Sequence, residues 1–272
     1  MDLARRSLLL GALVSAGCLA RPMTPDEARA AVEELVEVSR PEALVGRGLE
    51  LSTDFEAGRP VDVAAEELVD LWESEVGCAE VVRTTNVVTV DFGLPEDGCL
   101  WDGQPRSGVL YLAVERNDEV VEVSHVWQEL SDGGVVVAGD ALVSWTAGES
   151  TRQVVHQLSW SEGRRRGTTT GTRLQRVVDP VAALDGALEL DGERDWTRRR
   201  GGEWHLDLIA AWWRLDDPVP EGGSAQVVDP EGRKLELAFS RRGADLFEVT
   251  ATGRRLEADL QVSSTGEVGL VE

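Results

Sequence analysis

The spacing of apolar residues changes once along the chain, near residue 80, from a helical period to a period of two. Residues 24–27, Thr-Pro-Asp-Glu, form a capping box with proline at the first helical position. The apolar residues that follow at helical spacing are Ala28, Ala31, Val32, Leu35 and Val38. We expect this first helix to stop at Pro41, because proline lacks the N–H group that a helix interior needs.

A second helix is predicted over residues 62–76. Its apolar stripe consists of Ala65, Leu68, Val69, Trp72 and Val76. Between the two helices, Gly46, Gly48, Gly58 and Pro60 are expected to break the chain.

From residue 81 onward, apolar and polar residues alternate in runs that are separated by turn signals. The predicted strands are 81–92, 108–115, 120–130, 135–145, 152–161, 168–178, 187–190, 203–215, 225–228, 234–240, 246–250 and 256–262. Short connectors, among them Asp132-Gly133-Gly134 and Asp191-Gly192, are typical of hairpins. No helical pattern intervenes that would allow parallel crossovers, so the strands form an antiparallel meander of about ten or more.

The two faces of these strands differ in polarity. In the run 152–161, Val154, His156, Leu158 and Trp160 share one face, which predicts a sheet with one buried and one wet face. The run 203–215 carries large apolar residues on both faces and is expected to be covered on both sides at its C-terminal end.

The sequence therefore predicts a mainly β (α+β) fold, a long antiparallel β-meander in a curved or twisted sheet, with two N-terminal amphipathic helices packed on it. Residues 24–78 form the helical N-terminal segment and residues 79–272 the sheet region, and 24–272 make one domain. Lipoprotein-carrier proteins of the cell envelope share this outline, which is an architectural analogy.

The first residues are typical of a signal peptide over 1–17, with Arg5 and Arg6 before a short apolar segment and small residues at 15–17. Cys18 follows directly, and the segment resembles the lipobox of bacterial lipoproteins. The resemblance implies that Cys18 is acylated, that 18–23 is a lipidated tether, and that the protein is an outer-membrane lipoprotein of the envelope facing the periplasm or the cell surface. A plain signal peptide is the alternative, because Ser15 stands where a lipobox usually has Leu.

With Cys18 lipidated, Cys78 and Cys99 remain as an even pair in an oxidising compartment. A disulfide between them closes a loop of about 20 residues and contributes about 3 kcal/mol in the chain-entropy model. Two buried free thiols are the alternative.

The charge balance excludes one class of function. The 272 residues include 27 Lys and Arg against 50 Asp and Glu, a formal net charge of −23 that argues against nucleic-acid binding.

Three cysteines and three histidines leave little for a metal site, and we expect no metal ion and no cofactor. The histidines, His125, His156 and His205, lie in predicted strands; His125 and His156 are on apolar faces and are expected to be satisfied core or edge residues.

Arginine clusters recur at predicted hairpin tips. The candidate basic edge consists of Arg164, Arg165, Arg166, Arg198, Arg199 and Arg200. Such an edge could face anionic lipid headgroups or the acidic helical segment. The alternative is a set of solvated turns that protect the sheet edge.

Four tryptophans in strands form the other candidate surface. They are Trp127, Trp145, Trp160 and Trp204. They could pack in the core, line a groove for an apolar ligand, or stack on sugar rings.

One module carries a second resemblance. Residues 89–93, Thr-Val-Asp-Phe-Gly, are followed by Gly98-Cys99 and by residues 102–108, Asp-Gly-Gln-Pro-Arg-Ser-Gly. The module resembles one in uncharacterised β-rich bacterial surface lipoproteins, and the resemblance implies no activity.

The functional hypothesis is a lipid-anchored, non-enzymatic envelope protein with a binding or structural role. Its partners would be the membrane, through the lipid anchor, and an apolar ligand or another envelope protein. The alternatives are a carbohydrate-binding or cell-surface interaction module that uses exposed tryptophans, and a periplasmic hydrolase with carboxylates from separate strands. No catalytic residue is predicted, because the sequence lacks a nucleophile elbow, a phosphate-binding glycine loop and a calcium-loop spacing.

Overall fold

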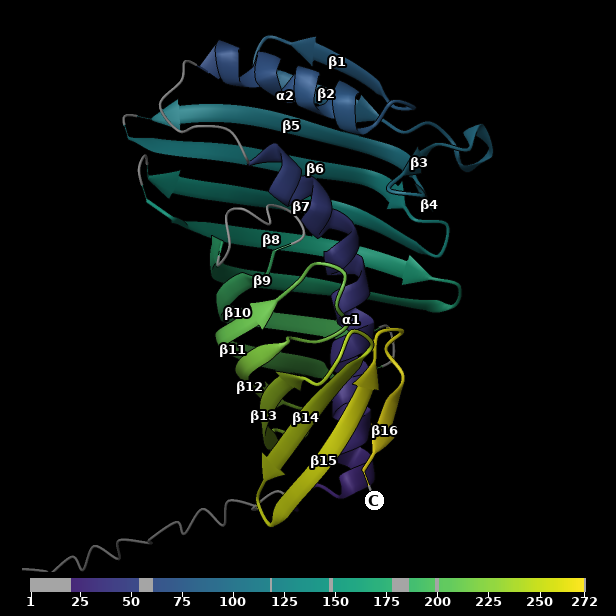
Figure 1. Cartoon of the computed structure of the whole chain (residues 1–272), viewed down its shortest axis with the longest axis vertical. Coiled ribbons are helices and arrows are strands. Elements are labelled where there is room, and N and C mark those ends of the chain that lie inside the picture. The colour runs from purple at the N-terminus through teal and green to yellow at the C-terminus, as the bar shows by residue number, and fades with distance from the viewer. Residues whose placement is uncertain are drawn as a thin grey trace, which may run out of the picture.

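The protein is one long antiparallel sheet that curves around a single long helix (Figure 1). The computed structural model describes residues 21–53, 61–117, 119–146, 149–177, 186–198 and 201–271. Fourteen strands form the sheet in the order β1-β2-β5-β6-β7-β8-β9-β10-β11-β12-β13-β14-β15-β16, and β3 and β4 form a separate ribbon. The order of the strands in the sheet follows their order along the chain, interrupted only by the β3–β4 ribbon between β2 and β5. This order confirms the predicted meander.

The described elements have these bounds: α1 Pro25–Ser52, α2 Val61–Glu75, β1 Glu80–Thr84, β2 Val87–Asp91, β3 Leu100–Trp101, β4 Gln104–Pro105, β5 Ser107–Asn117, β6 Val120–Ser131, β7 Val135–Thr146, β8 Thr151–Glu162, β9 Arg165–Val177, β10 Leu188–Arg198, β11 Glu203–Trp213, β12 Gly222–Val228, β13 Lys234–Arg241, β14 Leu246–Gly253, β15 Leu256–Ser263 and β16 Val268–Leu270. A short 3₁₀ helix spans Pro95–Asp97. The predicted run 81–92 is two strands, because the chain turns at Thr85, whose φ is 57°. The sequence did not predict the β3–β4 ribbon or β16.

Helix α1 continues through Pro41, so the predicted stop at this residue is wrong. Gly46 and Gly48, predicted as chain breakers, also lie inside the helix and are buried. A Cβ atom at Gly46 would lie 3.0 Å from Leu215, so the glycine lets the helix approach the segment that follows β11 closely. Contacts along the whole helix outweigh the weak local propensities of proline and glycine, which sequence reasoning weighs alone.

Helix α2 matches its prediction to within one residue at each end. It buries Ala65, Leu68 and Trp72 against the first strands of the sheet. Cys78, just after this helix, forms a disulfide with Cys99, so the predicted pairing is present. Neither helix in the described part of the chain is long and apolar enough to cross a lipid bilayer.

Strand β11 contains a β-bulge, and the bulge explains two errors of the sequence analysis. Ala210 has a φ of 45°, and its N–H donates to Oδ1 of Asp191 at 2.8 Å. Asp191 and Gly192, predicted to form a turn, therefore lie within β10 opposite the bulge. The extra residue reverses the alternation of β11 after Ile209, so Trp212 faces solvent like Ile209, with 47% and 51% of their surface exposed. The expected two-sided cover of this strand is wrong.

The interior divides into two apolar cores. The upper core lies under β2, β5–β8 and α2, and it includes Trp72, Trp127 and Leu68. The lower core lies under β10–β15, and it includes Trp196, Leu235 and Phe247. Helix α1 contributes to both, its first half to the lower core and its second half to the upper one (Figure 1). Strand β9, between them, contributes to neither.

Candidate functional site

Strand β9 turns polar side chains and glycines toward α1. Thr169 and Gln175 are each 1% exposed, while Leu174, a large apolar residue of the strand, is 50% exposed on the outer face. Arg173 lies between Thr169 and Gln175 at an alternate position, so it shares their face of the strand. The polarity of β9 is therefore reversed relative to its neighbours, and this reversal separates the two cores.

The buried and partly buried polar groups around β9 form what we call the polar waist. Its members are Glu42 and Glu50 of α1, Arg152 and His156 of β8, Thr169, Arg173 and Gln175 of β9, and Arg194 of β10.

Glu42 is the centre of the first half of the waist. Its Oε2 accepts a hydrogen bond from Nη1 of Arg194 at 2.6 Å, and its Oε1 accepts one from Thr169 at 3.1 Å. Nη1 of Arg173 lies 3.8 Å from the same carboxylate, and Nε2 of His156 lies 3.5 Å from it. Four groups from three strands therefore converge on one glutamate of the helix.

Glu50, two turns further along α1, is the centre of the second half. Its carboxylate forms an ion pair with Arg152 and accepts a hydrogen bond from Gln175. Arg152 also donates to Thr53. Nε of Arg173 donates to Oε1 of Gln175 at 3.4 Å, which links the two halves.

The electrostatics of the waist follow from burial and from these partners. Burial opposes the ionisation of Glu42, but Arg194, His156 and Arg173 together hold the pKa of its carboxyl below the ordinary value. Burial lowers the pKa of the Arg173 guanidinium, Glu42 raises it, and the neighbouring Arg194 lowers it. Burial and the charge of Arg173 lower the pKa of Arg152 to about 10. The two carboxylates of the waist thus face three guanidinium groups, a surplus of one positive charge.

A cavity lies beside this surplus charge, between α1 and strands β8–β11. The cavity has a volume of about 50 Å³, which is room for about three or four waters. Its apolar lining is Ala43, Leu188, Leu190, Leu208, Trp213 and Leu215. Its polar lining includes Ser39, Glu42, His156, Arg173 and Arg194.

The four candidate tryptophans do not meet in one groove in the described structure. Trp127 and Trp160 are buried in the upper core, and Trp145 packs partly buried against it. Trp204 packs against the lower core and stacks on Trp196 at 5.7 Å between ring centroids. None of the four lines the cavity. These positions favour the core interpretation.

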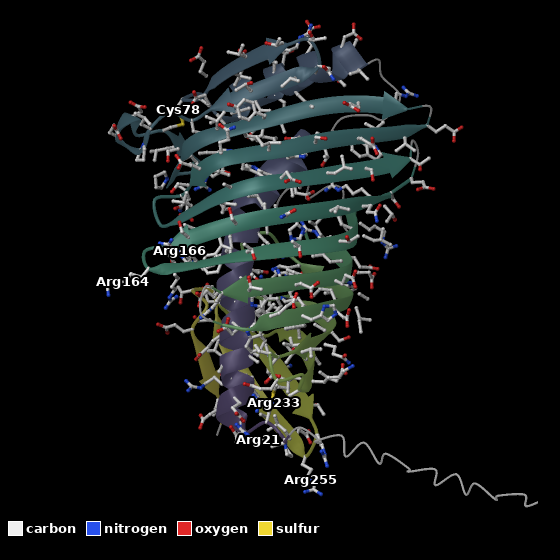
Figure 2. The ribbon with its side chains drawn as sticks, turned by 180° about the vertical axis from the view of Figure 1, so that it is seen from behind. Arg21, Cys78, Arg164, Arg166, Arg233 and Arg255 are labelled. Atoms are coloured by element: carbon white, nitrogen blue, oxygen red, sulfur yellow. A yellow bond between two sulfur atoms is a disulfide. The ribbon has the colours of Figure 1, made fainter. Side chains whose placement is uncertain are left out.

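The described part of the candidate basic edge comes together at one side of the sheet, where the register brings the ends of β8, β9 and β10 side by side. Figure 2 labels Arg164 and Arg166 at this edge. Arg164, Arg165, Arg166 and Arg198 line a recess there, together with Glu34 of α1. Nε of Arg198 lies 2.8 Å from Glu34, and Arg198 and Arg165 both pair with Glu37. Part of this edge therefore faces the acidic first helix. Arg199, Arg200 and the predicted lipidation site Cys18 lie outside the described residues.

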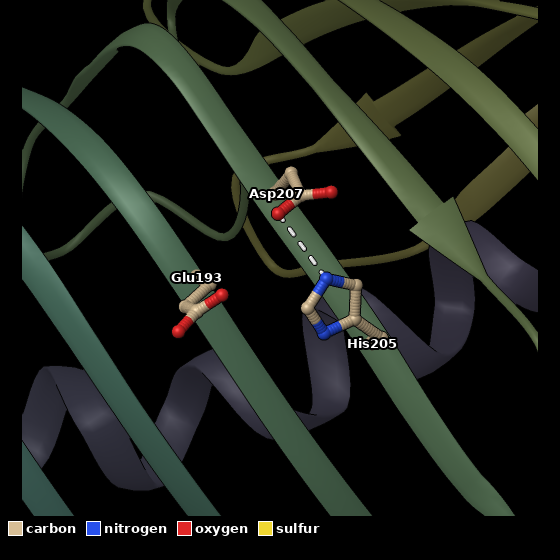
Figure 3. Close-up of side chains that lie close together, drawn as sticks. All are labelled: Glu193, His205 and Asp207. Atoms are coloured by element: carbon tan, nitrogen blue, oxygen red, sulfur yellow. Dashed lines mark hydrogen bonds and ion pairs between the residues drawn. The ribbon is translucent and has the colours of Figure 1, made fainter.

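His205 lies in a carboxylate cluster on the outer face of β10 and β11 (Figure 3). Its Nδ1 lies 2.7 Å from Oδ1 of Asp195 and its Nε2 lies 3.1 Å from Oδ1 of Asp207. Partial burial opposes protonation, but the two aspartates raise the pKa of the imidazole. Donor atoms of Glu193, His205 and Asp207 lie within 4.8 Å of one another. Both ring nitrogens already face carboxylates, so the geometry suits an imidazolium ion pair better than a metal ligand.

Sequence reasoning missed the polar waist because its residues are single charges scattered over α1 and three strands. The available signal was the predicted run 168–178, in which alternate positions hold Thr169, Gly171, Arg173 and Gln175 instead of apolar residues. No protein-family model and no curated sequence matches the chain, so its function is argued from this geometry.

Proposed function

We propose that the protein is a lipid-anchored envelope protein that binds a small, mainly apolar ligand between α1 and the sheet and catalyses no reaction. The observation that carries this proposal is the cavity at the polar waist, whose lining includes four leucines and one tryptophan beside its charged groups. It lies where the two cores fail to meet, so a ligand there would complete the apolar interior.

The anchor is supported by the sequence and by one covalent feature. The lipobox resemblance places an acylated Cys18 three residues before Arg21, where the described structure begins. The Cys78–Cys99 disulfide is typical of an oxidising compartment outside the cytoplasm.

Binding is favoured over catalysis by the state of the buried carboxylates. Glu42 and Glu50 are both held in ion pairs with arginines, and the pKa of Glu42 is lowered, which suits neither a general acid nor a free nucleophile. The carbohydrate alternative is disfavoured by the burial of Trp127 and Trp160, which leaves neither ring face open for stacking.

The anchor is tested by metabolic labelling with a fatty acid. Wild type should incorporate label and fractionate with membranes, whereas Cys18→Ala should do neither. Equal labelling of the two proteins would contradict the proposed anchor.

The ligand site is tested by calorimetric titration of the mature protein with short straight-chain alcohols of about two to five carbons, a size that suits a cavity with room for about three or four waters. We expect saturable binding to wild type and a loss of about tenfold in affinity for Ala43→Leu, whose larger side chain fills the cavity. Ala30→Leu, on the exposed face of the same helix, is the matched control and should bind like wild type. No saturable binding to wild type, or equal binding by both variants, would contradict the proposed site.

A further inference from the structure

We propose that the ligand of this cavity carries a carboxylate, bound by Arg194 and Arg173 at the polar end while its apolar chain lies along the leucines. This inference rests on the proposed binding function and names the chemical class of the ligand. It is carried by a buried guanidinium with unused hydrogen-bond donors, by an unbalanced charge, and by space next to both.

Arg194 is the first part of the argument. It is 4% exposed, and its Nη1 donates to Glu42 at 2.6 Å. Its Nε and Nη2 have no hydrogen-bond partner among the described residues. Buried donors without an acceptor are costly, and those on a charged group most of all, so these two atoms call for an acceptor in the cavity.

The orientation of Arg194 is fixed before any ligand arrives. Its guanidinium lies over the rings of Trp196 and Trp213, 5.6 and 5.9 Å from the two centroids. Trp213 also lines the cavity. A planar guanidinium held in this way presents its fork of donors to a planar carboxylate, the geometry that this pair prefers.

The surplus positive charge is the second part. Arg173 also lines the cavity, and its nearest carboxylate is already bound to Arg194. The other charged residues at the rim are engaged elsewhere: Arg214 pairs with Glu221 at 2.9 Å, and the side chain of Glu193 lies with His205 and Asp207 on the outer face (Figure 3). An anion in the cavity would therefore meet two guanidinium groups that share one glutamate.

Space for the head group is the third part. His156, Gly171 and Arg194 are cross-strand neighbours on β8, β9 and β10. A Cβ atom at Gly171 would lie 2.7 Å from Cε1 of His156, so the glycine keeps this place free of a side chain. Nε2 of His156, whose side chain is 4% exposed, faces Glu42 at 3.5 Å, and its Nδ1 lacks a hydrogen-bond partner within the described residues.

The test compares straight-chain acids with alcohols of the same carbon number at pH 7.4, by calorimetry on the mature protein. We expect each acid to bind wild type about 10- to 100-fold more tightly than its alcohol, as charge-assisted hydrogen bonds do. Arg194→Gln should reduce the ratio of acid to alcohol affinity, both measured on the same variant, by about tenfold or more, because the fork of donors is lost. Arg194→Lys, which keeps the charge but loses the fork, should retain an intermediate preference. A matched alkyl phosphate, whose head group is larger, should bind less tightly than the acid.

The outcomes separate this inference from the proposed function. Equal binding of acids and alcohols would overturn the carboxylate and leave an apolar site whose polar end holds water. A preference for acids that survives Arg194→Gln would overturn the role of Arg194. If neither class binds wild type, the proposed function fails as well. Circular dichroism shows whether each variant folds, and the comparison of acid with alcohol on wild type needs no variant.

Discussion

The two apolar cores and the polar waist between them are held together by different interactions, apolar packing in the cores and ion pairs in the waist. In the upper core, Trp72, Phe92 and Trp101 pack with ring centroids 5.1–6.2 Å apart, and large buried side chains fill the space. In the waist, one helix and three strands meet through charged groups and leave a cavity. Burying charges costs free energy that their mutual attraction only partly returns, whereas apolar packing stabilises directly.

The contrast shows that the chain is less stable at β9 than apolar packing there would make it. An apolar strand in place of β9 would join the two cores into one and would need no arginine. The ion pairs of the waist instead leave a cavity in the middle of the sheet, and this cavity is lined by the charged side chains of Arg173 and Arg194.

The largest effect is expected in the upper core. Trp127→Ala removes a side chain that is 1% exposed, and we expect a loss of about 3–5 kcal/mol in the free energy of unfolding. Trp212→Ala removes the same side chain from the outer face and should cost less than about 1 kcal/mol. Chemical denaturation measures both, and similar losses would contradict the assignment of faces.

A comparable loss is expected in the waist, for a different reason. Glu42→Gln leaves Arg173 and Arg194 without their shared carboxylate, and we expect a loss of about 3–5 kcal/mol by chemical denaturation. Replacing Glu42, Arg173 and Arg194 together by methionine should restore much of this stability, because both arginine pairs of Glu42 are then removed whole. If the triple variant were no more stable than Glu42→Gln, the waist would not be an electrostatic cost.

The Cys78–Cys99 disulfide lies at the upper core, and the lower core contains neither of these cysteines. Cys78→Ser with Cys99→Ser should destabilise the protein by about 3 kcal/mol, since the bridge closes a loop with a sequence separation of 21. Because the bridge joins segments of the upper region, proteolysis of the variant should begin near α2 and β3. Initial cleavage among β12–β16 would contradict this.

The smallest effect near neutral pH is expected from the histidines, and its sign differs between the buried His125 and His205 on the outer face. The raised pKa of His205 contributes stability that is complete below about pH 6.5 and is lost as pH rises through the folded value. Burial lowers the pKa of His125 to about 3, so this residue destabilises the fold only as pH falls from about 6.5 toward 3. Nuclear magnetic resonance titration of the two imidazoles should show His205 titrating above pH 6.5 and His125 still neutral at pH 5. The reverse order would contradict both environments.

The fold was largely predictable from the sequence because its signals are local. A period of two and short turns fix antiparallel neighbours, and a capping box at Thr24 marks the start of α1. The errors at Pro41 and Ala210 have one cause: packing between distant segments overrode the local preference.

The site was much less predictable. The cysteine pair followed from counting, but Glu42 lies beyond the expected end of its helix, and Arg173 and Arg194 look like ordinary strand charges. Only the three-dimensional register brings them together across β9 and β10. Which side of a strand faces the helix decides whether an arginine is solvated or buried.

The length of α1 has a mechanical consequence. A helix of 28 residues is a rod about 42 Å long, and both ends of this rod are embedded in apolar packing. A long twisted sheet flexes readily about its middle strands, but here any hinge motion at β9 would have to bend the rod or tear one end loose. The helix therefore acts as a strut that fixes the width of the gap beside Arg194.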